Sequence, residues 1–125
     1  MSATLSNSGG AIHVSSGSTT TSVVGGVAKV LEKHDESHNV DNSMNVSSLT
    51  DNGSGDTTVN YTNSTANIHQ YVVAGAGNDS TQNRLIQNIA TQTHTTSSHR
   101  YKVSNSTFTG VDTAVNNSVV HGDLA

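Results

Sequence analysis

Apolar and polar residues alternate along several stretches of this chain, and a period of two is typical of β-strands. The longest alternating stretch covers residues 59–73, with Tyr61 and Tyr71 on the same face. A shorter stretch over residues 40–48 has one half-apolar face. Asparagines lie among the apolar residues of the longer stretch, where stacked amides can bond along a ladder. Both stretches are therefore predicted to be strands.

Glycine-containing segments separate these strands. Residues 51–56 bring Asp, Asn and Gly together, and residues 75–79 read Gly-Ala-Gly-Asn-Asp, so both are predicted to be turns. Further strand-like segments follow at residues 83–91, 101–103, 108–115 and 119–120.

One stretch has helical rather than alternating spacing. Val27, Ala28 and Leu31 recur on one side, while Lys29, Glu32, Lys33 and Glu36 fall on the other. The Gly25-Gly26 pair precedes this stretch and disfavours an earlier helix start. We expect a short amphipathic helix at about residues 27–38.

These patterns together predict a mainly β fold, a sandwich or solenoid-like set of strands with that one short N-terminal amphipathic helix. Residues 1–22 are rich in Ser, Thr and Gly and are expected to be a flexible N-terminal arm. Residues 23–125 are expected to be a single β-rich assembly domain, completed by strand pairing between subunits.

The composition limits the core that one copy can build. Hydrophobic residues make up 31% of the 125 residues and aromatic residues 3%, which is little for an apolar core. Disordered chains usually carry many charges and prolines, but here charged residues are 11% and proline is absent. We therefore expect polar ladders and strand pairing to supply order that apolar volume does not supply.

Charge and chain chemistry exclude several classes of function. The net charge is −4 with only five Lys and Arg residues, whereas a nucleic-acid partner needs a basic stripe. The longest apolar run, residues 71–74, is too short to cross a membrane. No cysteine is present, so neither disulfides nor thiolate metal sites are expected.

Catalytic motifs are also missing from the sequence. His34 and His38 stand four residues apart on the expected helix, a spacing at which two imidazoles can share zinc, although no third ligand is evident. There is no Gly-x-Ser-x-Gly elbow and no phosphate-binding loop. We expect no enzyme activity and no bound cofactor, apart from the calcium discussed below.

A degenerate repeat occupies the middle of the chain. It resembles the Ser-x5-Gln-x-Gly-x-Gly-Asn-x-Ala-x3-Gln repeat of curlins, the curli fibre subunits, with a longer Gln-to-Gly interval and with Ser at the Ala position. Residues 72–78 followed by Gln82-Asn83 are also similar to the Ala-Ala-Gly-x-x-Asn-Gln-Gln motif of Fap-type functional amyloids. Both resemblances imply a secreted subunit stacked into a biofilm-matrix fibre. The matching residues are Ser64, Gln70, Gly75, Gly77, Asn78, Ser80, Gln82 and Gln87.

The same segment has a competing resemblance. Residues 74–81 are similar to one Gly-Gly-x-Gly-x-Asp-x-hydrophobic-x repeat of calcium-binding RTX β-rolls, and residues 52–56 are a second imperfect copy. This resemblance implies Ca²⁺ held by Asp79, Asp56 and Asn78. The alternative for the same residues is a turn without metal.

The pattern Asn-x-Ser/Thr, the acceptor for N-glycosylation, recurs along the chain, so surface glycans are a possible partner. It starts at Asn45, Asn52, Asn60, Asn63, Asn78, Asn105 and Asn116.

The sequence therefore predicts a structural subunit of an extracellular or cell-surface filament, of biofilm-matrix or pilus-like type, which polymerises with copies of itself. Strand edges without proline in 60–73 and 86–98 would recruit the next subunit. The alternatives are a virion component, such as a phage tail, fibre or decoration protein, and a calcium-dependent RTX-like adhesin. The residues expected to carry assembly are Val59, Tyr61, Gln70, Tyr71, Val73, Gln82, Ile86, Gln87 and Ile89.

Overall fold

A computed structural model describes the backbone of most of the chain, namely residues 4–8, 11–16, 19–22, 27–67, 72–78, 84–88 and 94–122. Side chains are described for residues 27–67, 74–78, 84–87 and 94–122. The described part contains strands and no helix, which confirms the mainly β prediction.

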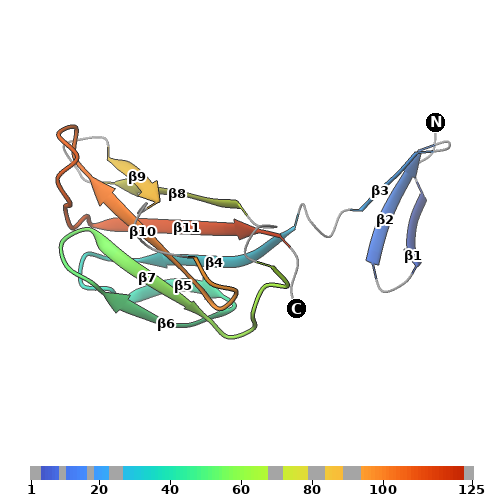
Figure 1. The fold of residues 1–125 in the computed structure, drawn as a ribbon, viewed down its shortest axis with the longest axis horizontal. Coiled ribbons are helices and arrows are strands. Elements are labelled where there is room, and N and C mark those ends of the chain that lie inside the picture. The colour runs from blue at the N-terminus through green and yellow to red at the C-terminus, as the bar shows by residue number, and fades with distance from the viewer. Residues whose placement is uncertain are drawn as a thin grey trace.

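Two four-stranded antiparallel sheets face each other as a sandwich (Figure 1). The first sheet has the order β5 (Val40–Met44), β4 (Ala28–His34), β11 (Val115–His121) and β8 (Val72–Asn78). The second has the order β6 (Val46–Asp51), β7 (Asp56–Tyr61), β10 (Ser98–Ser104) and β9 (Leu85–Asn88). The sandwich alternative of the predicted fold is therefore the one observed.

A small third sheet lies in the N-terminal arm. It has the order β1 (Thr4–Ser8), β2 (Ala11–Ser16) and β3 (Thr19–Ser22), all antiparallel. Figure 1 draws this sheet apart from the sandwich.

The core lies between the two large sheets and follows from strand alternation. Along β7, for example, Thr57, Val59 and Tyr61 are buried while the residues between them are not. Because successive side chains of a strand point to opposite faces, every second residue reaches the interior. Among the residues whose side chains are described, the buried apolar ones are Val30, Val59, Tyr61, Tyr101, Val103 and Val120.

The expected helix at 27–38 is wrong, because Ala28 to His34 form strand β4. Val30, Glu32 and His34 alternate into the core. The helical assignment placed Glu32 on the solvent side, whereas its side chain is buried and hydrogen-bonded across the sandwich. The residues 23–26 lie outside the described residues.

The predicted turn at 75–79 is also wrong over residues 75–78, which belong to strand β8. A Cβ on Gly77 would meet Val103 Cγ1 at 2.6 Å, and one on Gly75 would meet the backbone oxygen of Asn117 at 2.3 Å. These glycines therefore allow close packing rather than a change of chain direction. Asp79 lies outside the described residues.

Two long strands expected from alternation are shorter in the structure. The strand expected over 40–48 is divided at Asn45, whose φ of 60° carries the chain from one sheet to the other between β5 and β6. Asn tolerates this left-handed region better than most residues. The strand expected over 59–73 ends at Tyr61, and Asn63 beyond it is exposed.

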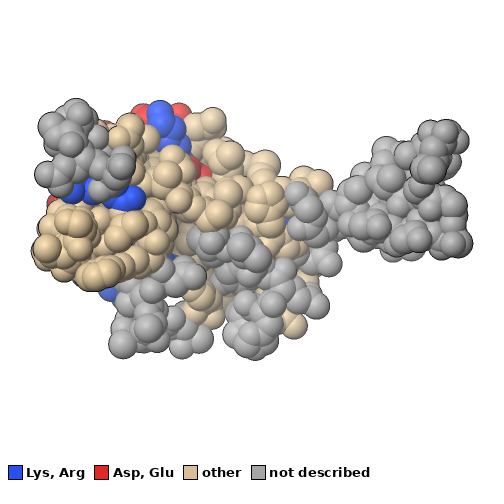
Figure 2. Space-filling view, turned by 90° about the horizontal axis from the view of Figure 1, so that it is seen from above, with Lys and Arg blue, Asp and Glu red and all other residues tan. Residues whose placement is uncertain are grey.

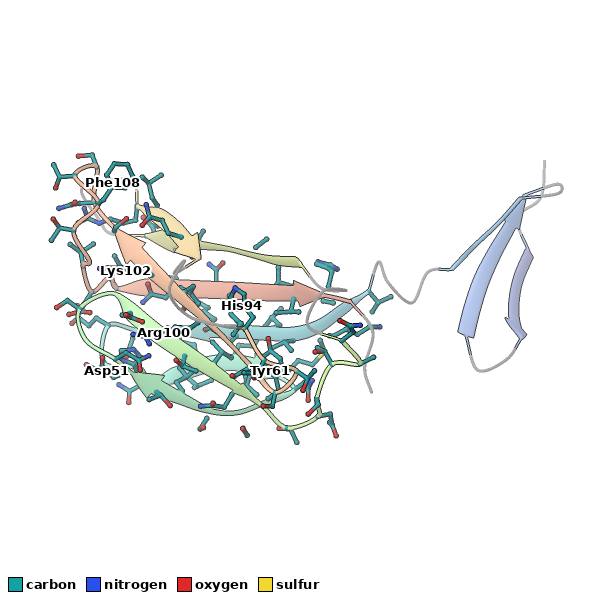
Figure 3. All side chains as sticks on the ribbon, viewed as in Figure 1. Asp51, Tyr61, His94, Arg100, Lys102 and Phe108 are labelled. Carbon is teal, nitrogen blue, oxygen red and sulfur yellow. The ribbon has the colours of Figure 1, made fainter. Side chains whose placement is uncertain are left out.

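The turn at 51–56 is confirmed as the hairpin between β6 and β7, with positive φ at Gly53 and Gly55. The segment 108–115 is loop up to Ala114, and only Val115 at its end belongs to strand β11. Phe108 lies at the tip of this loop, as Figure 3 shows, and has a φ of 62°.

Candidate functional site

A hydrogen-bonded network of polar side chains joins the two sheets inside the core, which we call the buried polar network. Each sheet contributes alternating residues, so the network replaces apolar contacts that a chain of this composition lacks. Buried polar groups in native proteins are nearly always hydrogen-bonded, and every residue of this network makes at least one such bond. The members are Glu32, His34, Tyr61, His99, Tyr101 and Ser118.

Tyr101 connects Glu32 to His34 within this network. Its hydroxyl lies 2.7 Å from Glu32 Oε1 and 2.9 Å from His34 Nε2. The other ring nitrogen of His34 donates to the backbone oxygen of Asp35 at 2.6 Å. Because that carbonyl only accepts, Nδ1 of His34 carries a proton.

Two arrangements of the protons, with the same net charge, make both contacts of the Tyr101 hydroxyl into hydrogen bonds. In one, Tyr101 donates to an ionised Glu32 and a doubly protonated His34 donates to Tyr101. In the other, a protonated Glu32 donates to Tyr101, which donates to a neutral His34. A proton can pass between Glu32 and His34 through the Tyr101 hydroxyl without moving any heavy atom.

Burial favours the neutral arrangement. It raises the pKa of Glu32 to about 7, although hydrogen bonds from Tyr101 and Ser118 act in the opposite direction. Burial also lowers the pKa of His34, against the effect of the Asp35 carbonyl. Oε2 of Glu32 has no hydrogen-bond partner among the described residues, and a bare buried oxygen adds to the cost of ionising this carboxyl.

His99 forms the second arm of the network. Its Nδ1 lies 2.8 Å from the Tyr61 hydroxyl, and its Nε2 lies 2.9 Å from Ser118 Oγ. Ser118 Oγ in turn donates to Glu32 Oε1 at 3.2 Å. Burial lowers the pKa of His99 to about 4, so its ring is neutral near pH 7. Tyr61 therefore donates to Nδ1, and the Nε2 hydrogen of His99 points to Ser118.

A hydroxyl beside an imidazole is also found in nucleophilic catalysis, but Ser118 is only 2% exposed and His99 only 1%. A dissolved substrate does not reach this pair in the folded sandwich. The geometry instead fits a structural role, in which the hydrogen bond between His99 and Ser118 joins the two sheets. The absence of enzyme activity stays a prediction.

His34 and His38 are close in space, as their spacing in sequence suggested, but not as helix neighbours. Their rings stack with centroids 4.9 Å apart, and Nε2 of His38 bonds to Thr57 Oγ1 at 2.9 Å. The two Nε2 atoms thus have separate partners in the protein. Across the described residues, no group of three or more His, Asp or Glu side chains is placed to hold a metal ion.

Asp56, one of the expected calcium ligands, forms an ion pair within the protein. Both carboxylate oxygens accept from the guanidinium of Arg100, at 2.6 and 2.7 Å. A calcium ion at Asp56 would have to displace this bidentate partner. Asn78 lies at the end of β8 opposite Val115, and Asp79 is not described.

Among the possible glycosylation positions, Asn116 is buried and its side-chain amide donates to the backbone oxygen of Thr113 at 3.0 Å. Asn52 and Asn63 are exposed. Glycosylation at the exposed positions stays a prediction, and a glycan on Asn116 does not fit the folded state.

The residues expected to carry assembly fall into three groups. Val59 and Tyr61 lie in the core on the central strand β7 and not at a sheet edge, and their part in assembly stays a prediction. Ile86 packs partly buried against the core from edge strand β9, and the backbones of Val73 and Gln87 belong to edge strands β8 and β9. The others lie outside the described residues, namely Gln70, Tyr71, Gln82 and Ile89.

Strand β8 is the candidate assembly site. It pairs with β11 over residues 72–78 and ends its sheet, so no described strand covers its other edge. None of its residues is charged or proline. Ala74, Ala76 and Asn78 are exposed. Figure 2 views the molecule from the β8 and β9 side, where most of the described surface carries no charge.

The sequence did not point to most of the buried polar network. The available signal is the spacing of two residues between Glu32 and His34 and between His99 and Tyr101, which puts each pair on one face of a strand. That signal identifies which residues share a face, but not that the two faces meet.

Fold and site together define an antiparallel β-sandwich with a polar core and an uncharged edge strand, β8, that no described strand covers. Comparison with protein-family models, curated proteins and solved structures gives no match for this chain. The resemblances to curlin, Fap-type and RTX repeats therefore stay predictions. No helix capable of crossing a membrane occurs in the described residues.

Proposed function

We propose that this protein is a structural subunit that assembles with copies of itself into an extracellular filament, and that strand pairing at the β8 edge joins the copies. The observation that carries the proposal is the unguarded character of β8. It has seven residues and no charge, proline or bulge in its pairing with β11.

Natural sheets usually protect an edge with charge, proline or a bulge, because its backbone groups otherwise pair with another chain. Strand β5, at the other edge of the same sheet, carries one charged residue, Asp41, whose carboxylate is neutralised within the same copy by Lys33 Nζ at 2.9 Å. An edge that no strand of the described residues covers along β8 supports strand addition, in which main-chain hydrogen bonds give the affinity.

The buried polar network changes how such assembly would work. Each copy already joins its own sheets through contacts such as Tyr101 to Glu32 and His99 to Ser118. A neighbour would therefore extend a sheet and satisfy its edge, and the interior of each copy would not depend on a donated strand.

The test uses Ala76→Lys, which puts a charge on the outer surface of β8, and Ala114→Lys as the matched control in the loop before β11. Both alanines are exposed, so neither variant is expected to lose its fold. Wild type and Ala114→Lys should form uniform filaments in negative-stain microscopy and large species in sedimentation. Ala76→Lys should lose them.

A wild type that stays monomeric at high protein concentration would overturn the proposal. Equal filament formation by Ala76→Lys and Ala114→Lys would remove β8 as the joining edge. Cooperative melting of both variants, followed by circular dichroism, checks that they are folded.

A further inference from the structure

We infer that the strand received by β8 is β5 of the next copy, so that copies join head to tail and the sheet runs on from one subunit to the next. This inference rests on the proposed function and names the partner of its site. Figure 1 shows β5 and β6 along one long side of the sandwich and β8 and β9 along the other.

Strand direction fits this arrangement. Every neighbouring pair in the order β5-β4-β11-β8 is antiparallel, so the two edge strands of this four-stranded sheet run in opposite directions. A second copy displaced sideways therefore brings its β5 antiparallel to β8, and the alternation continues across the junction. The other sheet, β6-β7-β10-β9, has the same property.

Side chains on the outer face of this sheet form two rows that end at the edges. In one row, Leu31 lies opposite Met44 and Val119, and Val119 lies opposite Ala74. This apolar row has a large residue at the β5 end, where Met44 is 46% exposed, and a small one at the β8 end.

The second row is polar and runs parallel to the first. Lys33 lies opposite Asn42 and Asn117, and Asn117 lies opposite Ala76. One antiparallel register of β5 against the β8 of a neighbour continues both rows together. In this register Met44 lies beside Ala74 and Asn42 lies beside Ala76. The two pairs agree with each other, because two residues back along one strand correspond to two residues forward along its antiparallel partner.

The size difference between the edges favours β5 over a second β8 as the partner. Met44 beside Ala74 has space to extend over the alanine towards Val119 of the neighbour, and such cross-strand apolar contacts stabilise sheets. Two β8 strands paired about a two-fold axis would bring alanines together and leave Met44 and Val40, both 46% exposed, uncovered. A two-fold pair also closes as a dimer, whereas a head-to-tail contact grows without end.

Single cysteines test the register directly, because the natural chain contains none. Two separately purified variants, Asn42→Cys and Ala76→Cys, are mixed as full chains and treated with a mild oxidant. Residues opposite each other in an antiparallel pair have Cα atoms about 4.5–5.5 Å apart, which suits a disulfide. We expect several-fold more disulfide between the two variants than within either one, and the same for Met44→Cys mixed with Ala74→Cys.

Ser106→Cys, at an exposed position in the β10–β11 loop, is the control and should cross-link with neither partner above background. Filaments whose Ala76→Cys chains link mainly to one another would overturn the β5 partner and leave the proposed function standing. Filaments with no disulfide in either mixture would likewise overturn this register. Absence of both filaments and disulfides would overturn the proposed function itself.

Discussion

The hydroxyl of Tyr101, on one sheet, lies 2.7 Å from Oε1 of Glu32 on the other, and both side chains are fully buried. A carboxyl in a protein interior needs hydrogen-bond partners, since an unsatisfied buried polar group costs about 1–3 kcal/mol. This contact therefore makes the stability of the sandwich depend on a single phenolic oxygen as well as on the buried ring that bears it.

We expect Tyr101→Phe to lower the free energy of unfolding by about 2–3 kcal/mol, because Glu32 and His34 both lose a partner while the ring volume stays. Urea unfolding measures the change. Tyr61→Phe is the comparison, with an expected fall of about 1 kcal/mol, since His99 keeps its contact with Ser118. Equal losses in the two variants would contradict the central place of Tyr101.

The pH dependence of stability should separate Glu32 from His99. The pKa of Glu32 is about 7 in the folded state against 4.5 as reference, so between these values the folded state holds a proton that the unfolded state releases. The contribution of Glu32 to the free energy of unfolding therefore falls as pH rises from 4.5 to 7. Relative to wild type, Glu32→Gln should therefore gain up to about 1.4 kcal/mol per pH unit across that window.

His99 has the opposite sign. Its pKa is about 4 when folded against 6.5 as reference, so its contribution is complete above pH 6.5 and is lost as pH falls towards 4. Relative to wild type, His99→Gln should become less stable as pH rises from 4 to 6.5. The two groups nearly cancel in the wild type between pH 4.5 and 6.5. Stability differences that do not change with pH would refute both assignments.

Packing behind β8 gives a third expectation. Gly77→Ala should destabilise the fold by about 1–3 kcal/mol, because the new methyl group would meet Val103 Cγ1 at 2.6 Å. Val103→Ala removes that methyl group, so the double variant should lose less stability than the two single losses added together. A double-mutant cycle from urea unfolding measures this coupling, and strict additivity would show that the two residues do not touch.

These cases show which parts of the structure the sequence predicts. Alternation identified a mainly β chain, and the Asp-Asn-Gly content of 51–56 identified a hairpin turn, since both signals are local. The signal failed at Glu32, where a charged residue is buried by partners far along the chain. It also failed at Gly75 and Gly77, where glycine serves close packing against distant residues. Contacts with residues far along the chain decide all three positions, and no spacing along one strand contains them.

The loop between β10 and β11 supplies the last expectation. Phe108 has a φ of 62° and is 66% exposed, so a bulky residue occupies a left-handed conformation with little burial in return. The turn around it is held by Asn105, whose Oδ1 accepts from the backbone nitrogens of Thr107 and Thr109, both at 3.0 Å.

Phe108→Asn should raise the free energy of unfolding by about 0.5–1 kcal/mol, because Asn adopts this region more readily. Ser106→Asn, at an exposed neighbouring position without positive φ, should leave stability unchanged. Thermal unfolding of both variants measures the difference, and a loss of stability in Phe108→Asn would mean that the exposed ring makes contacts worth more than the strain.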